Sequence, residues 1–213
     1  MLPIGAVSRF SWAQAYPSRP VRIIVPFAAG GGTDITARVI AQWLSERLGQ
    51  QFVIENRPGG GTNIGTEAAA KATADGYTLL MVGTSNTANP ALYDKLNFDL
   101  LRDFAPVAAV VRAPHIVVVN PALPDVPTVA ESVPGFESSI WFGLSAPRNT
   151  PVEIIDTLNR EVNAGLADPR IKARYAELGS TVFPISPADF DRLIVAETEK
   201  WAKVVKFSGA KPE

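Results

Sequence analysis

The 213-residue sequence contains no cysteine and only one histidine, His115. The absence of cysteine excludes disulfides, thiolate nucleophiles and cysteine-based metal sites, and a single imidazole excludes a multi-histidine metal site. Charge is balanced, with 20 lysine and arginine residues against 21 aspartate and glutamate residues and a formal net charge of -1. No basic surplus therefore favours nucleic acid as a partner, and no acidic tail indicates a charged partner.

Long hydrophobic runs are also missing. The most apolar stretches, such as residues 116–119, are far shorter than the roughly 20 residues that a membrane-spanning helix needs. Near the N-terminus, Ala13-Gln14-Ala15 has the small-x-small form of a signal-peptidase site, but residues 1–12 lack a basic segment and have only a weak apolar stretch. Residues 1–15 are thus either the remnant of a signal peptide, with a mature start near Tyr16, or a disordered extension.

What the sequence does contain is an alternation of strand and helix patterns. Residues 21–27 are almost continuously apolar and β-branched, as in a strand buried on both faces, and residues 52–55 and 77–82 form two further strand patterns. Helices are expected between them, one ending at Gly49 and one over residues 64–72. The expected apolar face of the first helix is formed by Ile35, Val39, Trp43, Leu44 and Leu48. This order implies right-handed crossovers and a largely parallel sheet.

The middle of the chain is less regular. Two strands are predicted over residues 104–111 and 115–119, separated by Arg112-Ala113-Pro114. A proline-rich loop over residues 120–135 and a strand over residues 140–145 follow.

Three helices are predicted in the last third. Thr150-Pro151-Val152-Glu153 has the form of a capping box with proline at the first helical position. Asp168-Pro169 begins the second helix, which ends near Gly179, and Ser186-Pro187 begins the third. The expected apolar faces are Ile155, Leu158, Val162 and Leu166 in the first helix and Phe190, Leu193, Ile194, Trp201 and Val205 in the third.

Two polar segments follow predicted strands and are candidates for binding. Glycines at 30–32 lie where a buried strand ends and a helix starts, and the free N–H groups and dipole of such a helix start favour an anion, so a carboxylate or phosphate fits there. The alternative is a glycine-rich connection in which Thr33 or Asp34 only caps the helix. Residues 83–87 follow the third strand, where their hydroxyls and amide either donate to a carboxylate or form an ordinary polar turn. A third segment, residues 57–63, is interpreted mainly as a turn.

Signatures of nucleotide binding and of catalysis fail. In both glycine-rich loops an isoleucine, Ile35 or Ile64, stands where a GxGxxG motif has its third glycine, and neither loop has the Gly-Lys-Ser/Thr ending of a P-loop. Thr87 replaces the last glycine of a GxSxG elbow. No grouping of Asp, Glu and His has metal-ligand spacing. We therefore predict a protein that is not an enzyme and has no catalytic residues, metal or cofactor, and we interpret His115 as structural.

Several motifs in a fixed order carry a resemblance to a known family. They are Tyr16-Pro17-Ser18-Arg19-Pro20-Val21-Arg22-Ile23, Val25-Pro26-Phe27-Ala28-Ala29-Gly30-Gly31-Gly32-Thr33-Asp34, Glu55-Asn56-Arg57-Pro58-Gly59, Asp75-Gly76-Tyr77-Thr78-Leu79-Leu80, Asn89-Pro90-Ala91-Leu92-Tyr93, Trp141-Phe142-Gly143-Leu144 and Lys200-Trp201-Ala202-Lys203-Val204-Val205. Over nearly all of residues 16–213 the chain resembles the substrate-binding receptors of tripartite tricarboxylate transporters, also called Bug proteins.

The resemblance implies a type II periplasmic-binding-protein fold, in which a small carboxylate lies between two lobes of α/β structure. It also implies a ligand site in the glycine-rich loop after the first strand and in the segment after the third. Asp34 is the family's acidic position, and because it would repel a carboxylate, it is expected to cap the helix or to receive a ligand amino group. The implied ligand-binding residues are Phe27, Ala28, Ala29, Gly30, Gly31, Gly32, Thr33, Asp34, Thr84, Ser85 and Asn86.

The sequence departs from the family pattern in its middle. Family members leave the first lobe through one segment and return through another, but here both share Pro121-Ala122-Leu123-Pro124, and the facing ligand loop with its Tyr-Lys-Gly is absent. We expect an in-frame loss of the second lobe, whether natural, engineered or an assembly artefact. The prediction is a single lobe, with residues 16–119 as its first part, residues 120–135 as the junction and residues 136–213 as its C-terminal part.

The function implied is that of a periplasmic receptor. It would capture a small carboxylate and deliver it to the membrane subunits of a tripartite tricarboxylate transporter, with binding weakened by the missing lobe. Self-association through the exposed cleft face is expected, because exposed apolar patches and open strand edges find partners. The alternatives are a remnant lobe that binds nothing and an enzyme with an unrecognised site.

Overall fold

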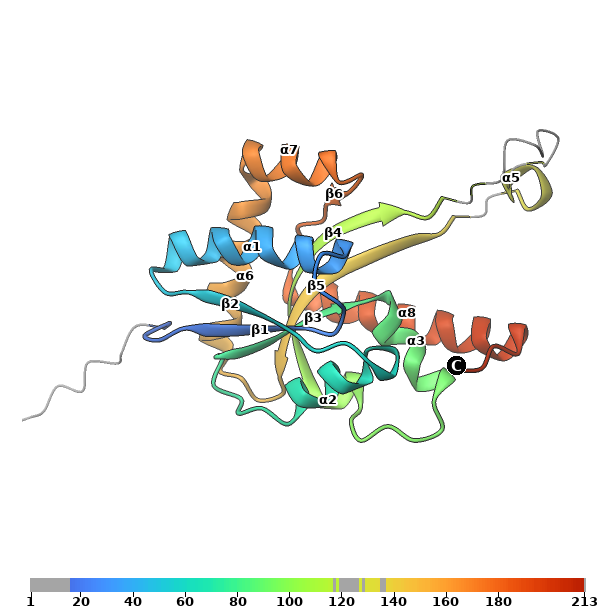
Figure 1. Cartoon of the computed structure of the whole chain (residues 1–213), viewed down its shortest axis with the longest axis horizontal. Coiled ribbons are helices and arrows are strands. Elements are labelled where there is room, and N and C mark those ends of the chain that lie inside the picture. Colours follow the sequence, from blue (N-terminus) through green and yellow to red (C-terminus); the bar gives the residue numbers. More distant parts are fainter. Residues whose placement is uncertain (1–15, 117, 119–126, 128, 135–136, 213) are drawn as a thin grey trace, which may run out of the picture.

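The computed structural model describes residues 16–116, 118, 127, 129–134 and 137–212. These residues form one α/β unit around a sheet with the strand order β2-β1-β3-β5-β4-β6 (Figure 1). The strands are β1 (Val21–Val25), β2 (Phe52–Asn56), β3 (Thr78–Gly83), β4 (Phe104–Pro114), β5 (Ser139–Pro147) and β6 (Thr181–Val182). The predicted class, a single α/β lobe of the type II periplasmic-binding-protein kind, agrees with this architecture.

The sheet is mixed. β1 pairs in parallel with β2 and with β3, as the alternation of strands and helices predicts. β5 then enters between β3 and β4 and is antiparallel to both, and β6 is antiparallel to β4. Because β4 is reached through two antiparallel steps, it runs in the same direction as β1, β2 and β3. Four strands therefore share one direction, and the C-terminal part of the chain supplies the central strand β5.

Helices cover both faces of the sheet. One face is packed by α1 (Gly32–Leu48), α6 (Val152–Ala167) and α7 (Pro169–Glu177), and the other by α2 (Asn63–Ala70), α3 (Thr84–Leu92) and α8 (Pro187–Ser208). Short helices η1 (Gly60–Thr62), α4 (Leu100–Asp103) and α5 (Val129–Ser132) complete the chain. Ile23 packs into the first core and its neighbour Ile24 into the second, because successive strand residues point to opposite faces. Burial on both faces explains the continuously apolar pattern of β1.

Most predicted helix ends are confirmed. Gly49 closes α1 in the left-handed conformation with φ of 69°, and the Asp168 carboxylate accepts the Arg170 N–H at 2.8 Å at the start of α7. The Ser186 hydroxyl oxygen accepts the Asp189 N–H at 3.1 Å at the start of α8. The capping box at Thr150 is wrong. Its hydroxyl donates to the Pro147 carbonyl at 2.8 Å, and α6 begins one residue later than expected.

Two further expectations need correction. The strand predicted over residues 104–111 is longer than expected, because β4 continues through Arg112 to Pro114. In the strand predicted over residues 115–119, the described residues His115, Ile116 and Val118 are not in a strand, and residues 117 and 119 lie outside the described residues. Pro114 lies at the end of the strand, opposite Ser139, where its missing N–H does least harm to the ladder.

The apolar face of α1 is rotated from the predicted one. Its buried apolar residues are Ala37, Ile40, Ala41 and Leu44, while Val39, Trp43 and Leu48 lie only partly buried at its margin. Only Leu44 of the predicted face is fully buried, and the prediction missed Ile40 and the small residues Ala37 and Ala41, which allow α1 to approach the sheet closely.

β4 and β5 continue together as a two-stranded arm that projects away from the body of the lobe toward α5 (Figure 1). Side chains join the two strands along the arm: Arg112 donates to the Ser139 hydroxyl at 2.8 Å, and the His115 ring lies 2.8 Å from the Ser138 hydroxyl. Near its end, Ile116 and Val118 are 77% and 83% exposed. Most of the predicted junction over residues 120–135 falls outside the described residues, as does the predicted export segment over residues 1–15.

Candidate functional site

The parallel strands β1, β2 and β3 end at one edge of the sheet, and the segments that follow them surround a pocket of about 470 Å³. In open α/β sheets this edge is the usual position of a ligand. The β1–α1 loop, the β2–α2 loop and one side of α3 each contribute to its walls. The lining residues are Pro26, Phe27, Ala28, Pro58, Gly59, Gly61, Thr62, Ser85, Ala88, Asn89, Leu92 and Tyr93.

Asp34 fixes the shape of the β1–α1 loop. Its buried carboxylate accepts the Gly30 N–H at 2.9 Å, the Arg38 guanidinium at 2.8 Å and the Asn56 amide at 2.9 Å. The same Asn56 amide donates to the Phe27 carbonyl at 3.0 Å, so both ends of the loop are held. Burial would raise the pKa of Asp34, but the hydrogen bonds from Arg38, Gly30 and Asn56 outweigh it and lower the pKa to about 2. Asp34 is therefore ionised at neutral pH and its charge is compensated within the loop.

Only one of the three glycines in this loop has a backbone conformation that requires glycine. Gly30 has φ of 83°, where an L side chain is strained. Gly31 has φ of -77° and an added Cβ there would come no closer than 3.6 Å to the Ala28 carbonyl, and a Cβ on Gly32 would meet nothing within 4 Å. Residues 28–32 are all exposed. The fold thus requires glycine at the first of the three positions and leaves the other two as open backbone.

The segment after β3 is built into the protein more deeply than predicted. The Thr84 hydroxyl oxygen accepts the Trp141 backbone N–H at 3.3 Å, and the Asn86 side chain accepts the Gly83 N–H at 2.9 Å and donates to the Thr66 hydroxyl at 2.8 Å. Thr84 and Asn86 are buried. Of the three residues predicted there, only the half-buried Ser85 lines the pocket.

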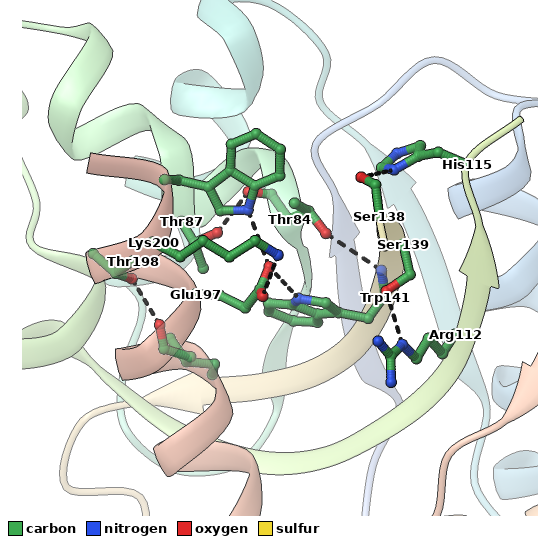
Figure 2. A network of polar contacts seen from close by, with 12 residues as sticks. Thr84, Thr87, Arg112, His115, Ser138, Ser139, Trp141, Glu197, Thr198 and Lys200 are labelled. Atoms are coloured by element: carbon green, nitrogen blue, oxygen red, sulfur yellow. Dashed lines mark hydrogen bonds and ion pairs between the residues drawn. The ribbon is translucent and has the colours of Figure 1, made fainter. Parts of the chain in front are cut away.

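A polar network braces the start of α3 from behind. Figure 2 shows the Trp141 indole and the Lys200 ammonium directed at the Glu197 carboxylate. The indole N–H groups of Trp141 and Trp201 donate to one carboxylate oxygen at 3.4 and 3.0 Å, and the Lys200 ammonium lies 2.9 Å from the other. Burial would raise the pKa of Glu197, but these partners outweigh it and lower the pKa. Because the backbone N–H of Trp141 also donates to Thr84, helix α8 and strand β5 together position the first residue of α3.

The β2–α2 loop contributes more to the pocket than the sequence analysis allowed. Pro58, Gly59, Gly61 and Thr62 line it, although this segment is interpreted there mainly as a turn. Gly59 has φ of 116°, so the loop conformation depends on glycine. The signal was present in the sequence, because a glycine run between a strand and a helix is the same pattern that marks Gly30.

One side of α3 was also missed. The Asn89 amide donates to the Gly61 carbonyl at 2.6 Å and to the Thr62 hydroxyl at 3.1 Å, which ties α3 to the β2–α2 loop. Ala88, Leu92 and Tyr93 complete this wall.

The predicted site residues therefore separate into three groups. Phe27, Ala28 and Ser85 line the pocket. Ala29, Gly30, Gly31 and Gly32 are exposed and follow the lining residue Ala28 along the chain, and Thr33, Asp34, Thr84 and Asn86 are buried.

The pocket contains neutral chemistry. None of the described residues that line it carries a charge. Among the described residues, no group of three or more His, Cys, Asp or Glu side chains is placed to hold a metal ion, and no helix in that part of the chain is long and apolar enough to cross a membrane. The groups offered to a ligand are backbone N–H groups, hydroxyls and apolar surface, which suit binding of a small organic acid.

Comparison with known proteins gives consistent relatives. BugT of Bordetella pertussis is 28% identical over 300 aligned positions that cover 93% of this chain and 92% of BugT. A UPF0065 protein of the same organism is 41% identical over 113 residues, which are 53% of this chain and 35% of that protein. Among solved structures, R. palustris Rpa4515 with adipate superposes with a TM-score of 0.83 at 28% identity, covering 93% of this chain and 100% of that one. The periplasmic binding protein BugD gives a TM-score of 0.82 at 26% identity, with the same coverage.

Part of the length aligned to BugT has no counterpart in this chain. The 93% of 213 residues aligned to BugT is about 198 residues, so about 100 of the 300 aligned positions have no residue here. The sequence model of a family, the tripartite tricarboxylate transporter family receptor, matches this chain in two pieces, residues 36–124 and residues 120–209. The two pieces overlap at residues 120–124. Those two matches together span most of the chain, and the relatives and fold neighbours are binding receptors and not enzymes. The chain therefore belongs to the tripartite tricarboxylate transporter receptor family.

Proposed function

We propose that this chain is a solute-binding receptor that captures a small carboxylate in the periplasm and presents it to the membrane subunits of a tripartite tricarboxylate transporter. Family membership supports the transport role. The related structure at 28% identity contains adipate, which supports a carboxylate as the class of ligand.

The observation that carries the proposal is the open backbone at Gly31 and Gly32. Neither position has a positive φ, and neither has a neighbour that a methyl group would strike. Glycine where the fold does not need it is explained by a ligand that approaches the backbone closely. At the start of α1 such a ligand meets unpaired N–H groups and the positive end of the helix dipole, which favour a carboxylate.

We further infer that a second lobe has been lost between β4 and β5. The overlap of the two family matches at residues 120–124 and the roughly 100 unmatched positions support this, as does the return of β5 beside β4. A cleft with one wall leaves a bound carboxylate solvated on one side. Hydrogen bonds to charged groups contribute about 1.5–3 kcal/mol each, so losing two of them weakens binding by roughly two to four orders of magnitude.

The same exposure supports a second candidate, a remnant lobe that retains the scaffold but captures nothing. Residues 28–32 have no covering element in the described structure. A chimera separates the two candidates: the roughly 100 positions of BugT that have no counterpart in this chain are inserted between residues 120 and 124. Under the receptor proposal, isothermal titration with dicarboxylates shows affinity about 100- to 10,000-fold higher in the chimera than in the chain itself. A folded chimera that binds no carboxylate would favour the remnant.

A further inference from the structure

The second half of α8 carries a basic and apolar surface that lies outside both cores of the lobe. Residues 200–212 contain four lysines and no acidic residue, although the chain as a whole has a formal net charge of -1. The first half of the helix is anchored by Phe190 and Ile194, which are buried against the sheet. In residues 200–212 only Trp201 and Val205 are partly buried, and Figure 1 shows the last turns of α8 at the edge of the lobe. This end of the helix is therefore open to a partner.

Lysines and apolar side chains share one face of this segment. Spacings of three and four residues place four side chains next to one another along the helix. They are Lys200, Lys203, Val204 and Phe207, and Lys206 borders the same face. Val204 is 41% exposed and Phe207 is 96% exposed, so the ring of Phe207 adds almost nothing to the packing of the lobe. The helix dipole accounts for lysines near the C-terminus of a helix, but it does not account for an aromatic ring exposed among them.

Three of the four lysines have no acidic partner among the described residues. Lys200 is held 2.9 Å from the carboxylate of the brace behind α3. No ion pair in the described part of the chain involves Lys203, Lys206 or Lys211. Glu199 lies one helical turn before Lys203 in the sequence, but the two form no ion pair within these residues. The cations of this face can therefore contact an external anion.

The composition of this face favours a lipid surface over a protein partner. Helices that lie at a membrane interface combine lysine or arginine with exposed aromatic or leucine side chains. The long stem of a lysine lets its charge reach a lipid phosphate while an apolar neighbour enters the layer below. The buried centre of a protein interface is instead poor in lysine and enriched in arginine, and residues 200–212 contain no arginine. Charge complementarity thus favours the phosphates of anionic phospholipids.

We propose that the second half of α8 is a peripheral contact site for an anionic phospholipid surface. Phe207 enters the boundary between headgroups and acyl chains, and Lys203 and Lys206 contact the lipid phosphates. The contact goes beyond the receptor function proposed above, because it needs neither a bound carboxylate nor a second lobe. One short segment gives weak and reversible binding. Such binding would hold the receptor at the surface in which the membrane subunits of a transporter lie.

Sedimentation of the intact chain with vesicles tests this site. Vesicles of phosphatidylglycerol and phosphatidylcholine are compared with vesicles of phosphatidylcholine alone. We expect binding to the anionic vesicles only, and we expect salt to weaken it, because the Debye length shortens from about 10 Å at 0.1 M to about 3 Å at 1 M. Lys203→Glu combined with Lys206→Glu is expected to weaken binding at least about 25-fold, since each lysine close to an anionic surface contributes about fivefold. Phe207→Ser, which keeps the charge, is expected to weaken binding about tenfold.

A matched control separates this site from a general effect of charge. Lys172→Glu combined with Arg174→Glu makes the same change of charge on α7, which covers the opposite face of the sheet, and is expected to bind nearly as well as the unchanged chain. Far-UV circular dichroism checks that every variant is folded. Equal loss of binding in the α7 and α8 charge variants, or no loss in Phe207→Ser, would overturn the proposal. Binding to purified membrane subunits without binding to vesicles would overturn it in favour of a protein partner.

Discussion

Replacing Gly31 and Gly32 by alanine separates the needs of the fold from those of the ligand. Gly31→Ala and Gly32→Ala each add a methyl group in open space at a backbone conformation that alanine accepts. Such a change restricts the unfolded chain and stabilises a protein by about 0.4–1 kcal/mol, as expected at Gly32. At Gly31, the N-cap of α1, this gain is offset because alanine is disfavoured at an N-cap. Gly30→Ala forces a left-handed residue with φ of 83° and is expected to destabilise by about 1–2 kcal/mol. Urea unfolding midpoints measure all three variants.

Ligand affinity, unlike stability, is expected to fall in the Gly31→Ala and Gly32→Ala variants. A methyl group at Gly31 or Gly32 occupies the space that the carboxylate needs and removes at least one charge-assisted hydrogen bond, so affinity falls about tenfold or more. The affinities are measured by NMR titration, or by calorimetry in the two-lobed chimera. Gly49→Ala is the control, because it strains a left-handed helix end of φ 69° outside the lining of the pocket. Unchanged affinity in stable Gly31 and Gly32 variants would refute the close approach of a ligand to this backbone.

Three further predictions concern stability and association. Asp34 has a pKa of about 2 in the folded chain against 3.8 for an ordinary aspartate, so its contribution to stability is complete above about pH 4 and is lost as the pH falls through 2. This contribution is at most about 2 kcal/mol, and it is reduced because Arg38 is half exposed. Asp34→Asn should remove this pH dependence from urea unfolding curves. Glu197→Gln, which weakens the brace behind α3, should lower stability by about 1 kcal/mol, and an unchanged unfolding midpoint would contradict that role. Replacing the exposed Ile116 and Val118 at the arm by serine should reduce self-association in sedimentation velocity, whereas a wild-type chain that is already monomeric would contradict the expected association.

Local signals explain what the sequence predicts well. Asp168-Pro169 and Ser186-Pro187 place helix starts because an N-cap side chain and a following proline act within a few residues. Thr150-Pro151 shows the same pattern, but the prediction fails because the threonine hydroxyl donates to the Pro147 carbonyl and does not cap the helix that follows. The insertion of β5 between β3 and β4 has no local signal, because strand neighbours far apart in the chain are chosen by packing.

In the candidate site, too, the sequence predicts the features that have a local signal and misses those that depend on distant contacts. The β1–α1 loop is predictable because a buried strand, glycines and a helix start follow one another, and the structure places Phe27 and Ala28 at the pocket. Asp34 is predictable as an acidic residue with a supporting role, but its partner Asn56 lies 22 residues away and is found only in three dimensions. Tyr93 could not be recognised from the sequence, because its place on the pocket wall depends on how α3 lies against Gly61.

The arm formed by β4 and β5 also bears on how receptors of this kind change over evolution. Pro114 faces Ser139 across the ladder, so the chain that leaves the sheet and the chain that returns stand side by side. A segment of any length joined at these two points starts and finishes in the same place, and the entropy of closing a loop grows only with the logarithm of its length. Folded modules can therefore be removed or exchanged at the end of this ribbon with little disturbance of the six-stranded sheet. We therefore expect ligand preference to change by exchange of the segment joined at these two points, while the lobe itself is retained.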